Sequence, residues 1–141
     1  MLQPKMGKTL ERLGLNPDNS IVIGSGILQA LGIRKSRDID LVVTQEIYTS
    51  LKKSGNFKIV ESHSREILKD DLFEIGTDWN VLGKSYSFED FDNNSIIIDG
   101  VRYITLDFLY RAKKSWLHQK NVRQKDIEDV RLIELYTTEI N

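Results

Sequence analysis

The sequence of 141 residues contains no cysteine and only two histidines, His63 and His118. Without cysteine there is no disulfide, no thiol nucleophile and no cysteine-ligated zinc site, and two histidines exclude a histidine-rich metal site. No segment has the apolar core of a signal peptide, and no run is long enough to cross a bilayer. These absences predict a cytoplasmic protein that does not associate with membranes.

Charge of either sign is not in excess, because 20 basic and 21 acidic residues leave a net charge of −1. This balance does not favour a nucleic-acid binder held by bulk electrostatics. The length and the 40% apolar content predict one globular domain over residues 1–141, large enough to bury a core. The basic residues are nevertheless uneven, since the segment from Arg102 to Lys125 holds seven of them against one acid, Asp107. Such a segment suits a bound polyphosphate, although a solvated helix with ordinary surface lysines gives the same pattern.

The most informative stretch runs from Ser20 to Thr44. An apolar run, Ile21 to Ile23, predicts a strand that ends at a Gly24-Ser25-Gly26 turn and leads into a short helix stopped by Gly32. Glycines allow the backbone of such a turn to approach a phosphate closely. The turn is therefore a candidate phosphate-binding loop, although Gly-Ser-Gly alone is more often only a turn.

A second apolar strand follows and begins with two acids, Asp38 and Asp40. Side chains alternate along a strand, so the two carboxylates share one face while Ile39, Leu41 and Val43 share the other. Two neighbouring carboxylates on a strand built for burial repel each other and lose hydration. Because a divalent cation such as Mg²⁺ or Mn²⁺ removes both penalties, we interpret the pair as a metal site.

These residues resemble a known family. Gly24-Ser25, followed at a distance by Asp38-Ile39-Asp40, looks like the signature of the polymerase-beta-type nucleotidyltransferase superfamily. The run from Gly32 to Asp40, which includes Arg37, is closer to small bacterial members akin to antibiotic and toxin–antitoxin nucleotidyltransferases. The resemblance implies that Gly24, Ser25, Gly26 and Arg37 bind a nucleoside triphosphate, with ATP as the expected donor, and that both aspartates bind magnesium. The minimal adenylylating toxin–antitoxin members carry an arginine directly after Gly-Ser, which this chain lacks.

In that superfamily a third carboxylate comes from a neighbouring strand and completes the metal cage. Glu74 matches this place best, because it lies between the large apolar residues Phe73 and Ile75 of a predicted strand from Leu72 to Ile75. Asp78 is the alternative, provided that the strand continues that far. Both remain open at this point, and Glu74 could also simply face solvent on a one-sided sheet.

Lys113 is the remaining candidate residue. It falls on the apolar stripe of a predicted helix from Leu106 to His118 that Thr105 caps. A lysine on such a stripe either extends its ammonium group to the surface or directs it into a polar cleft. Related small nucleotidyltransferases often carry a lysine on this helix, so the resemblance implies that Lys113 contacts phosphate. The spacing of Arg123, Lys125, Asp126 and Asp129 also resembles a run near the end of these members.

The order of the predicted elements gives an α/β (α+β) domain, nucleotidyltransferase-like, with a small mixed sheet and flanking helices. An Asp99-Gly100 turn between two β-rich runs predicts a hairpin over Ser95 to Ile104. The segment from Glu61 to Arg65, with His63, is expected to be a polar connection. The further predicted elements are a helix over Met1–Leu13, a helix over Gln45–Ser54, a strand over Phe57–Val60 and a closing helix over Lys125–Thr138.

Three functional hypotheses follow. The first is a magnesium-dependent nucleotidyltransferase that moves a nucleoside monophosphate, AMP from ATP, onto a hydroxyl acceptor that the sequence does not identify; Asp38, Asp40 and Glu74 would hold the metal, and Glu74 would accept the proton. The second is a non-catalytic, antitoxin-like protein with the same fold that works as a homodimer or with a partner protein. The third is a globular domain with solvated aspartates and no response to divalent ions.

Overall fold

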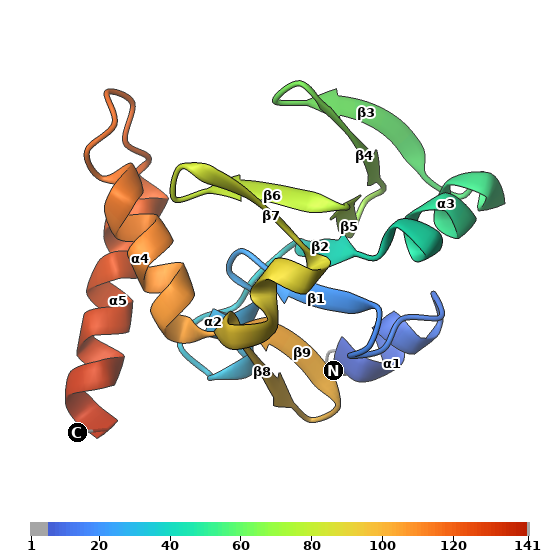
Figure 1. The fold of residues 1–141 in the computed structure, drawn as a ribbon. Helices are drawn as coiled ribbons and strands as arrows, with labels where there is room; N and C mark the ends of the chain where they lie inside the picture. The colour runs from blue at the N-terminus through green and yellow to red at the C-terminus, as the bar shows by residue number, and fades with distance from the viewer. Residues whose placement is uncertain (1–5, 141) are drawn as a thin grey trace.

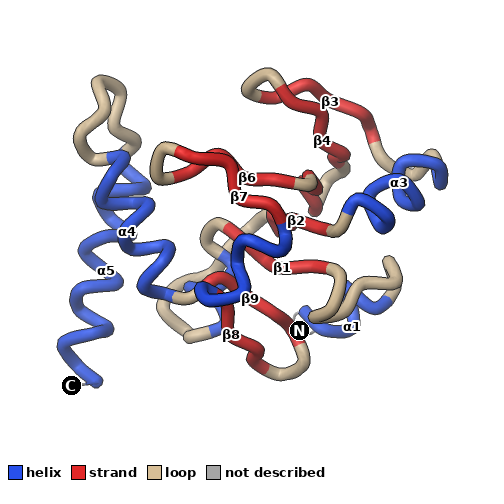
Figure 2. Tube along the Cα trace, viewed as in Figure 1, coloured by secondary structure: helices blue, strands red, loops and turns tan. Residues whose placement is uncertain are grey.

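The computed structural model describes residues 6–140, so the first residues of the predicted Met1–Leu13 helix lie outside the described residues. A seven-stranded mixed sheet forms the centre of the molecule, with strand order β3-β4-β5-β2-β1-β9-β8 (Figure 1). Figure 2 shows helices on both sides of these strands, with α4 and α5 packed against each other. In this part of the chain no helix is long and apolar enough to cross a membrane.

The predicted elements recur with small shifts at their ends. Thr44 accepts a hydrogen bond from the amide of Ile47 and caps α3, and Thr105 does the same for α4. Asp99 and Gly100 both have positive φ values, as the tight hairpin turn requires. The helices are α1 (Met6–Glu11), α2 (Gly26–Ala30), α3 (Gln45–Ser54), α4 (Leu106–Trp116) and α5 (Gln124–Ile140), with a 3₁₀ helix over Phe88–Asn94. The strands are β1 (Ser20–Ile23), β2 (Ile39–Val43), β3 (Lys58–Ser62), β4 (Arg65–Lys69), β5 (Phe73–Gly76), β6 (Asp78–Val81), β7 (Lys84–Ser87), β8 (Ser95–Ile98) and β9 (Val101–Ile104).

Three strands were not predicted. β4 carries two consecutive buried residues, Ile67 and Leu68, rather than an alternating pattern. The segment from Glu61 to Arg65 is therefore not a simple connection, because only His63 and Ser64 form the turn between β3 and β4. β6 and β7 form a separate two-stranded sheet joined at Leu82 and Gly83. Neither turn has the Asn-Gly or Asp-Gly sequence that marks a hairpin.

The sequences of the central strands are apolar because these strands are buried in the core. Every residue of β1 is buried, and in β2 only Asp40 is not fully buried. An aromatic cluster joins the β6–β7 hairpin to α4, with Tyr86 and Phe108 rings 5.1 Å apart and Trp79 and Phe108 rings 6.0 Å apart. Phe108 is completely buried. This cluster fixes the β6–β7 hairpin against the helices, although the hairpin forms a sheet separate from the main one.

Candidate active site

Sheet pairing brings two of the predicted carboxylates together. β2 and β5 are parallel neighbours, and Asp40 is the register partner of Glu74, so both side chains lie on one face of the sheet. The carboxyl group of Glu74 lies close enough to Asp40 to raise the pKa of Asp40. Glu74 also forms an ion pair with Lys69, at 3.2 Å. Asp38 lies directly before β2 with an exposed side chain, and its charge acts on Asp40.

The environment of Asp40 makes its ionised form unfavourable. Burial raises the pKa of Asp40 to about 7, and the hydrogen bond and negative charge of Glu74 and the charge of Asp38 act in the same direction. Lys125, at the start of α5, partly opposes them. The Oδ1 atom of Asp40 is buried without a hydrogen-bond partner. A buried carboxylate oxygen without a partner, next to a second carboxylate, is suited to binding a divalent cation.

The Gly24-Ser25 turn lies against this pair. In the β1–β2 ladder Ile23 is the partner of Asp40, so the residue after Ile23 lies at the level of the carboxylates. Gly24 has φ +64°, and a Cβ atom added there would lie 2.8 Å from Oδ2 of Asp40. Both the backbone conformation and the close approach therefore require glycine. The turn is held beside the acids, as the sequence predicts for a phosphate-binding loop.

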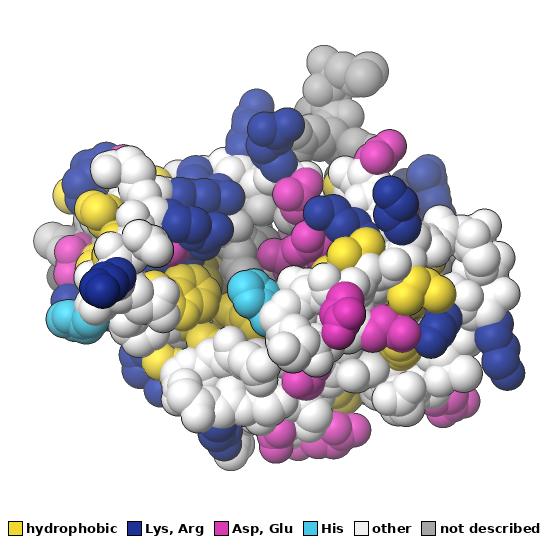
Figure 3. All heavy atoms as spheres, turned by 90° about the horizontal axis from the view of Figure 1, so that it is seen from above, with side chains coloured by type: hydrophobic (Ala, Val, Ile, Leu, Met, Phe, Trp, Pro, Cys, Tyr) yellow, Lys and Arg dark blue, Asp and Glu magenta, His cyan; other side chains and the backbone are white. Residues whose placement is uncertain are grey.

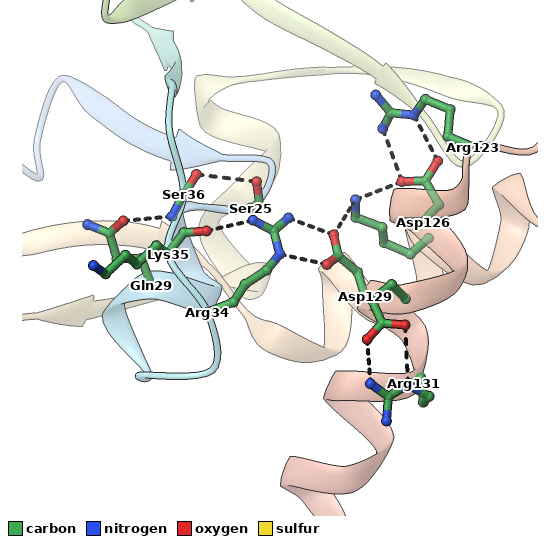
Figure 4. Close-up of polar contacts among 11 residues, drawn as sticks. Ser25, Gln29, Arg34, Lys35, Ser36, Arg123, Asp126, Asp129 and Arg131 are labelled. Carbon is green, nitrogen blue, oxygen red and sulfur yellow. Dashed lines mark hydrogen bonds and ion pairs between the residues drawn. The ribbon is translucent and has the colours of Figure 1, made fainter.

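Ser25 is connected to the loop that carries Asp38. Its hydroxyl group lies 3.4 Å from that of Ser36, which donates to the backbone carbonyl of Asp38 at 3.3 Å. The amide of Ser36 donates to Oε1 of Gln29 at 2.8 Å (Figure 4). Gly26, by contrast, packs closely on Val22, which gives it a structural role. Arg37 is exposed and lines a cavity of about 250 Å³ together with Ser36 and Asp38.

Glu74 and Asp78, the two candidates for the third carboxylate, have different surroundings. Asp78 belongs to β6, not to an extension of β5. It forms an ion pair with Arg65 at 3.0 Å and accepts a hydrogen bond from Ser85 at 2.8 Å. The structure therefore places Glu74, rather than Asp78, opposite Asp40. Over residues 6–140 no three carboxylate or histidine side chains form a preassembled metal-binding group, so the acidic pair leaves part of a metal's coordination to a ligand or water.

Lys113 is buried in a network of charged residues between α4 and α5. Its ammonium group contacts Asp126 at 2.7 Å and Asp129 at 2.8 Å. Arg34 binds Asp129 through two hydrogen bonds, at 2.7 and 2.8 Å, and Arg123 binds Asp126 (Figure 4). Of the two alternatives expected for Lys113, the structure shows the second: its ammonium group points into a polar cluster and not to the surface. In that cluster the ammonium group pairs with Asp126 and Asp129.

The network keeps both aspartates ionised. Burial by itself raises the pKa of Asp129, but hydrogen bonds and charge from Arg34 and Lys113 outweigh it and hold the pKa below its usual value. Because Arg34 belongs to the loop between α2 and β2, its contact with Asp129 ties the start of α5 to the loop that leads to Asp38. The network is therefore part of the scaffold of the acidic site.

Two basic residues near the acids were not predicted as ligands. Lys125 lowers the pKa of Asp40, and Asp40 is among the charges that raise the pKa of Arg123. Both residues are exposed, at the start of α5 or just before it. The sequence held one signal for Lys125, because a positive charge in the first turn of a helix opposes the helix dipole. Arg123 and Lys125, more than Lys113, supply positive charge close to the carboxylates.

The arrangement of these elements is that of a known structure. A crystal structure of a "putative nucleotidyltransferase" from Thermotoga maritima superimposes on the chain with a TM-score of 0.56. The chain has a nucleotidyltransferase-like fold. The match covers 99% of this chain and 96% of the other, at 17% sequence identity, so the likeness extends over the whole architecture. No family model and no curated protein matches the chain.

Proposed function

We propose that this chain is a magnesium-dependent nucleotidyltransferase that transfers a nucleoside monophosphate, AMP from ATP, to a hydroxyl acceptor. The observation that carries the proposal is the pairing of Asp40 with Glu74 across β2 and β5, beside the Gly24-Ser25 turn. A Cβ atom at Gly24 would contact Asp40, and this close approach supports a single site formed by the turn and the acids. The nucleotidyltransferase-like fold supports the same activity.

The unpartnered oxygen of Asp40 and the neighbouring carboxylates of Glu74 and Asp38 fit a magnesium ion, which supplies charge neutralisation for the triphosphate when bound. Ser25 and the backbone amides around Gly24 would bind the terminal phosphates. Glu74 would accept the proton of the acceptor hydroxyl, because it adjoins Asp40 and is not fully buried.

Positive charge close to the acids is available for the phosphates. Arg123 and Lys125 interact with Asp40, and Arg37 follows Ser36 on the loop that leads to Asp38. These side chains are exposed, so they can reorient towards a triphosphate. Positioning of donor and acceptor together with neutralisation of phosphate charge then accounts for catalysis.

Calorimetric titration with ATP, in the presence and absence of Mg²⁺ or Mn²⁺, tests the proposal. Wild-type protein should bind ATP only with the metal, and Asp40→Asn should abolish this binding. Asp71→Asn, an exposed acid on the loop before β5, is the matched control and should bind like wild type. A folded wild-type protein that binds no nucleotide with either metal would contradict the proposal. Metal-dependent binding without pyrophosphate release on any acceptor would favour the non-catalytic, antitoxin-like alternative.

A further inference from the structure

A second concave site lies beside the acidic pair. It is a cleft of about 510 Å³ between the β3–β4 hairpin, β6 and the segment that joins α4 to α5. Figure 3 shows a hollow on this side of the molecule with hydrophobic side chains at its floor, and histidine, basic and acidic side chains around it. The side chains that line it include Arg65, Trp79, Asn80, Trp116 and Arg123. We refer to this site as the tryptophan cleft.

The aromatic side of the cleft is held rigidly. The rings of Trp79 and Trp116 lie 6.2 Å apart in an edge-to-face arrangement, and Trp79 also packs on Phe91 and Phe108 of the core. Both tryptophans remain partly exposed. Each of these partly exposed indole rings can offer a face on which an aromatic ligand stacks.

The polar side of the cleft contains an unused hydrogen-bond donor. Arg65 donates through Nη1 to the carbonyl and to the carboxylate of Asp78, but its Nε atom is buried without a partner. A buried guanidinium N–H without an acceptor is unfavourable, and an anionic or carbonyl oxygen of a ligand would satisfy it. Asn80 adds an exposed amide that can pair with a hydrogen-bonding edge.

The charge of the cleft selects against cationic ligands. Arg65 and Arg123 line it and are paired with Asp78 and Asp126, and Asp126, the acid among its described lining residues, is also paired with Lys113. A polyamine-like acceptor would therefore meet arginines rather than free carboxylates. A ligand that combines a planar ring with negative charge fits both sides of the site.

The position of the cleft relative to the acids gives it a role. In the strand order β4-β5-β2-β1, Asp40 on β2 lies between the Gly24-Ser25 turn after β1 and the strands β4 and β5. Nη1 of Arg65 lies 3.6 Å from the position of a Cβ atom at Gly76, which shares a face of β5 with Glu74. The cleft thus begins on the side of the acidic pair opposite the turn expected to hold the donor phosphates.

We propose that the tryptophan cleft binds an unpaired nucleotide, with its base stacked on Trp79 or Trp116 and its phosphate at Arg65. Its assignment as the acceptor, whose hydroxyl faces Glu74, rests on the proposed function, whereas nucleotide binding in the cleft does not. Free mononucleotides and the end of a single-stranded chain share this chemistry, and the experiment distinguishes them.

Tryptophan fluorescence reports on this cleft directly, because Trp79 and Trp116 are the only tryptophans of the chain. Protein in EDTA is titrated with AMP, CMP and a single-stranded trinucleotide, and spermine serves as the cationic comparison. Saturable quenching by nucleotides and not by spermine is expected. A trinucleotide that binds at least about tenfold more tightly than the mononucleotides identifies a chain end, because further nucleotides add stacking and phosphate contacts; equal affinities identify a free nucleotide.

Variants locate the binding site. Arg65→Gln and Trp116→Leu should each weaken binding about tenfold or more, as expected for loss of a charged contact or of base stacking. Arg131→Gln is the matched control for charge: Arg131 lies on the exposed face of α5, pairs with Glu128 and should leave the affinity unchanged. Asn80→Ala, at an exposed position in the cleft, should weaken binding without affecting folding, which circular dichroism checks for every variant.

Three results would overturn the proposal. One is the absence of saturable quenching in folded wild-type protein, and another is quenching that Arg65→Gln, Trp116→Leu and Asn80→Ala all leave unchanged. The third is loss of metal-free quenching in Asp40→Asn, which would assign the base to the triphosphate site instead. Because the titration contains no metal, its outcome is independent of the calorimetric test of the transferase activity.

Discussion

Replacement of Asp40 by asparagine tests the electrostatic description of the acidic site. Burial and Glu74 raise the pKa of Asp40 from 3.8 to about 7, so in this pH range the folded protein retains a proton that the unfolded chain has lost. The folded state binds more protons than the unfolded chain, and stability therefore falls as pH rises from about 4 to about 7. Asparagine resembles the protonated carboxyl group and carries no such dependence.

The magnitude follows from the same values. A difference of one between the folded and unfolded pKa corresponds to about 1.4 kcal/mol, which gives at most about 4 kcal/mol above pH 7. Asp40→Asn should thus be more stable than wild type by up to about 4 kcal/mol near pH 8, and close to wild type near pH 4. Magnesium should stabilise wild type near pH 8 but not the variant, because the cation binds the ionised carboxylate.

Urea denaturation at the two pH values, with and without Mg²⁺, measures these differences. Asp71→Asn is again the control, since its exposed carboxylate should give no gain in stability at either pH. A variant that is no more stable than wild type near pH 8, or that gains equally at both pH values, would show that Asp40 is not desolvated. The description of the site would then be wrong at its first step.

Three further predictions concern the neighbouring residues. Glu74→Gln removes a negative charge beside Asp40 and should lower the pKa of Asp40, which NMR titration of its carboxyl carbon would detect; an unchanged pKa would exclude direct coupling. Gly24→Ala should destabilise the protein by about 1–3 kcal/mol, through its positive φ and the contact with Asp40, and abolish metal-dependent ATP binding in calorimetry. Asp129→Asn should cost about 3–5 kcal/mol in urea denaturation, because it removes the partner of the partly buried Arg34 and one of the two partners of the buried Lys113. Glu128→Gln, in an exposed ion pair, should have little effect, and similar losses for both would refute a special role of the buried network.

The Gly24-Ser25 turn, the two aspartates and the strands around them could be predicted because their signals are local. Alternation along the predicted strand put Asp38 and Asp40 on one face, although in the structure Asp38 lies directly before β2. The apolar runs of β1 and β2 reflect burial on both sides. Asp99 and Gly100 marked their hairpin because both positions need positive φ. In each case the residues that carry the signal are neighbours in the chain.

A comparison of three hairpins shows that not every turn carries a local sequence signal. His63-Ser64 and Leu82-Gly83 adopt positive φ values like Asp99-Gly100, but Ser64 and Leu82 are not residues that favour them. Packing holds the second of these turns, because Trp79 and Tyr86 place the β6–β7 hairpin on Phe108. A sequence window contains no information on such contacts, so β4, β6 and β7 were missed, and with them one wall of the tryptophan cleft.

By itself the sequence determined the central strands, the Gly24-Ser25 turn and the two aspartates Asp38 and Asp40, because neighbouring residues in the chain specify them. Only the tertiary structure decided that Glu74 rather than Asp78 lies opposite Asp40, since that choice depends on the parallel register of β2 and β5. The tertiary structure likewise decided that Lys113 forms ion pairs with Asp126 and Asp129, because α5 supplies both aspartates and packs on α4. Charge partners that are distant in the chain are set by packing, and a pattern within one segment cannot reveal them.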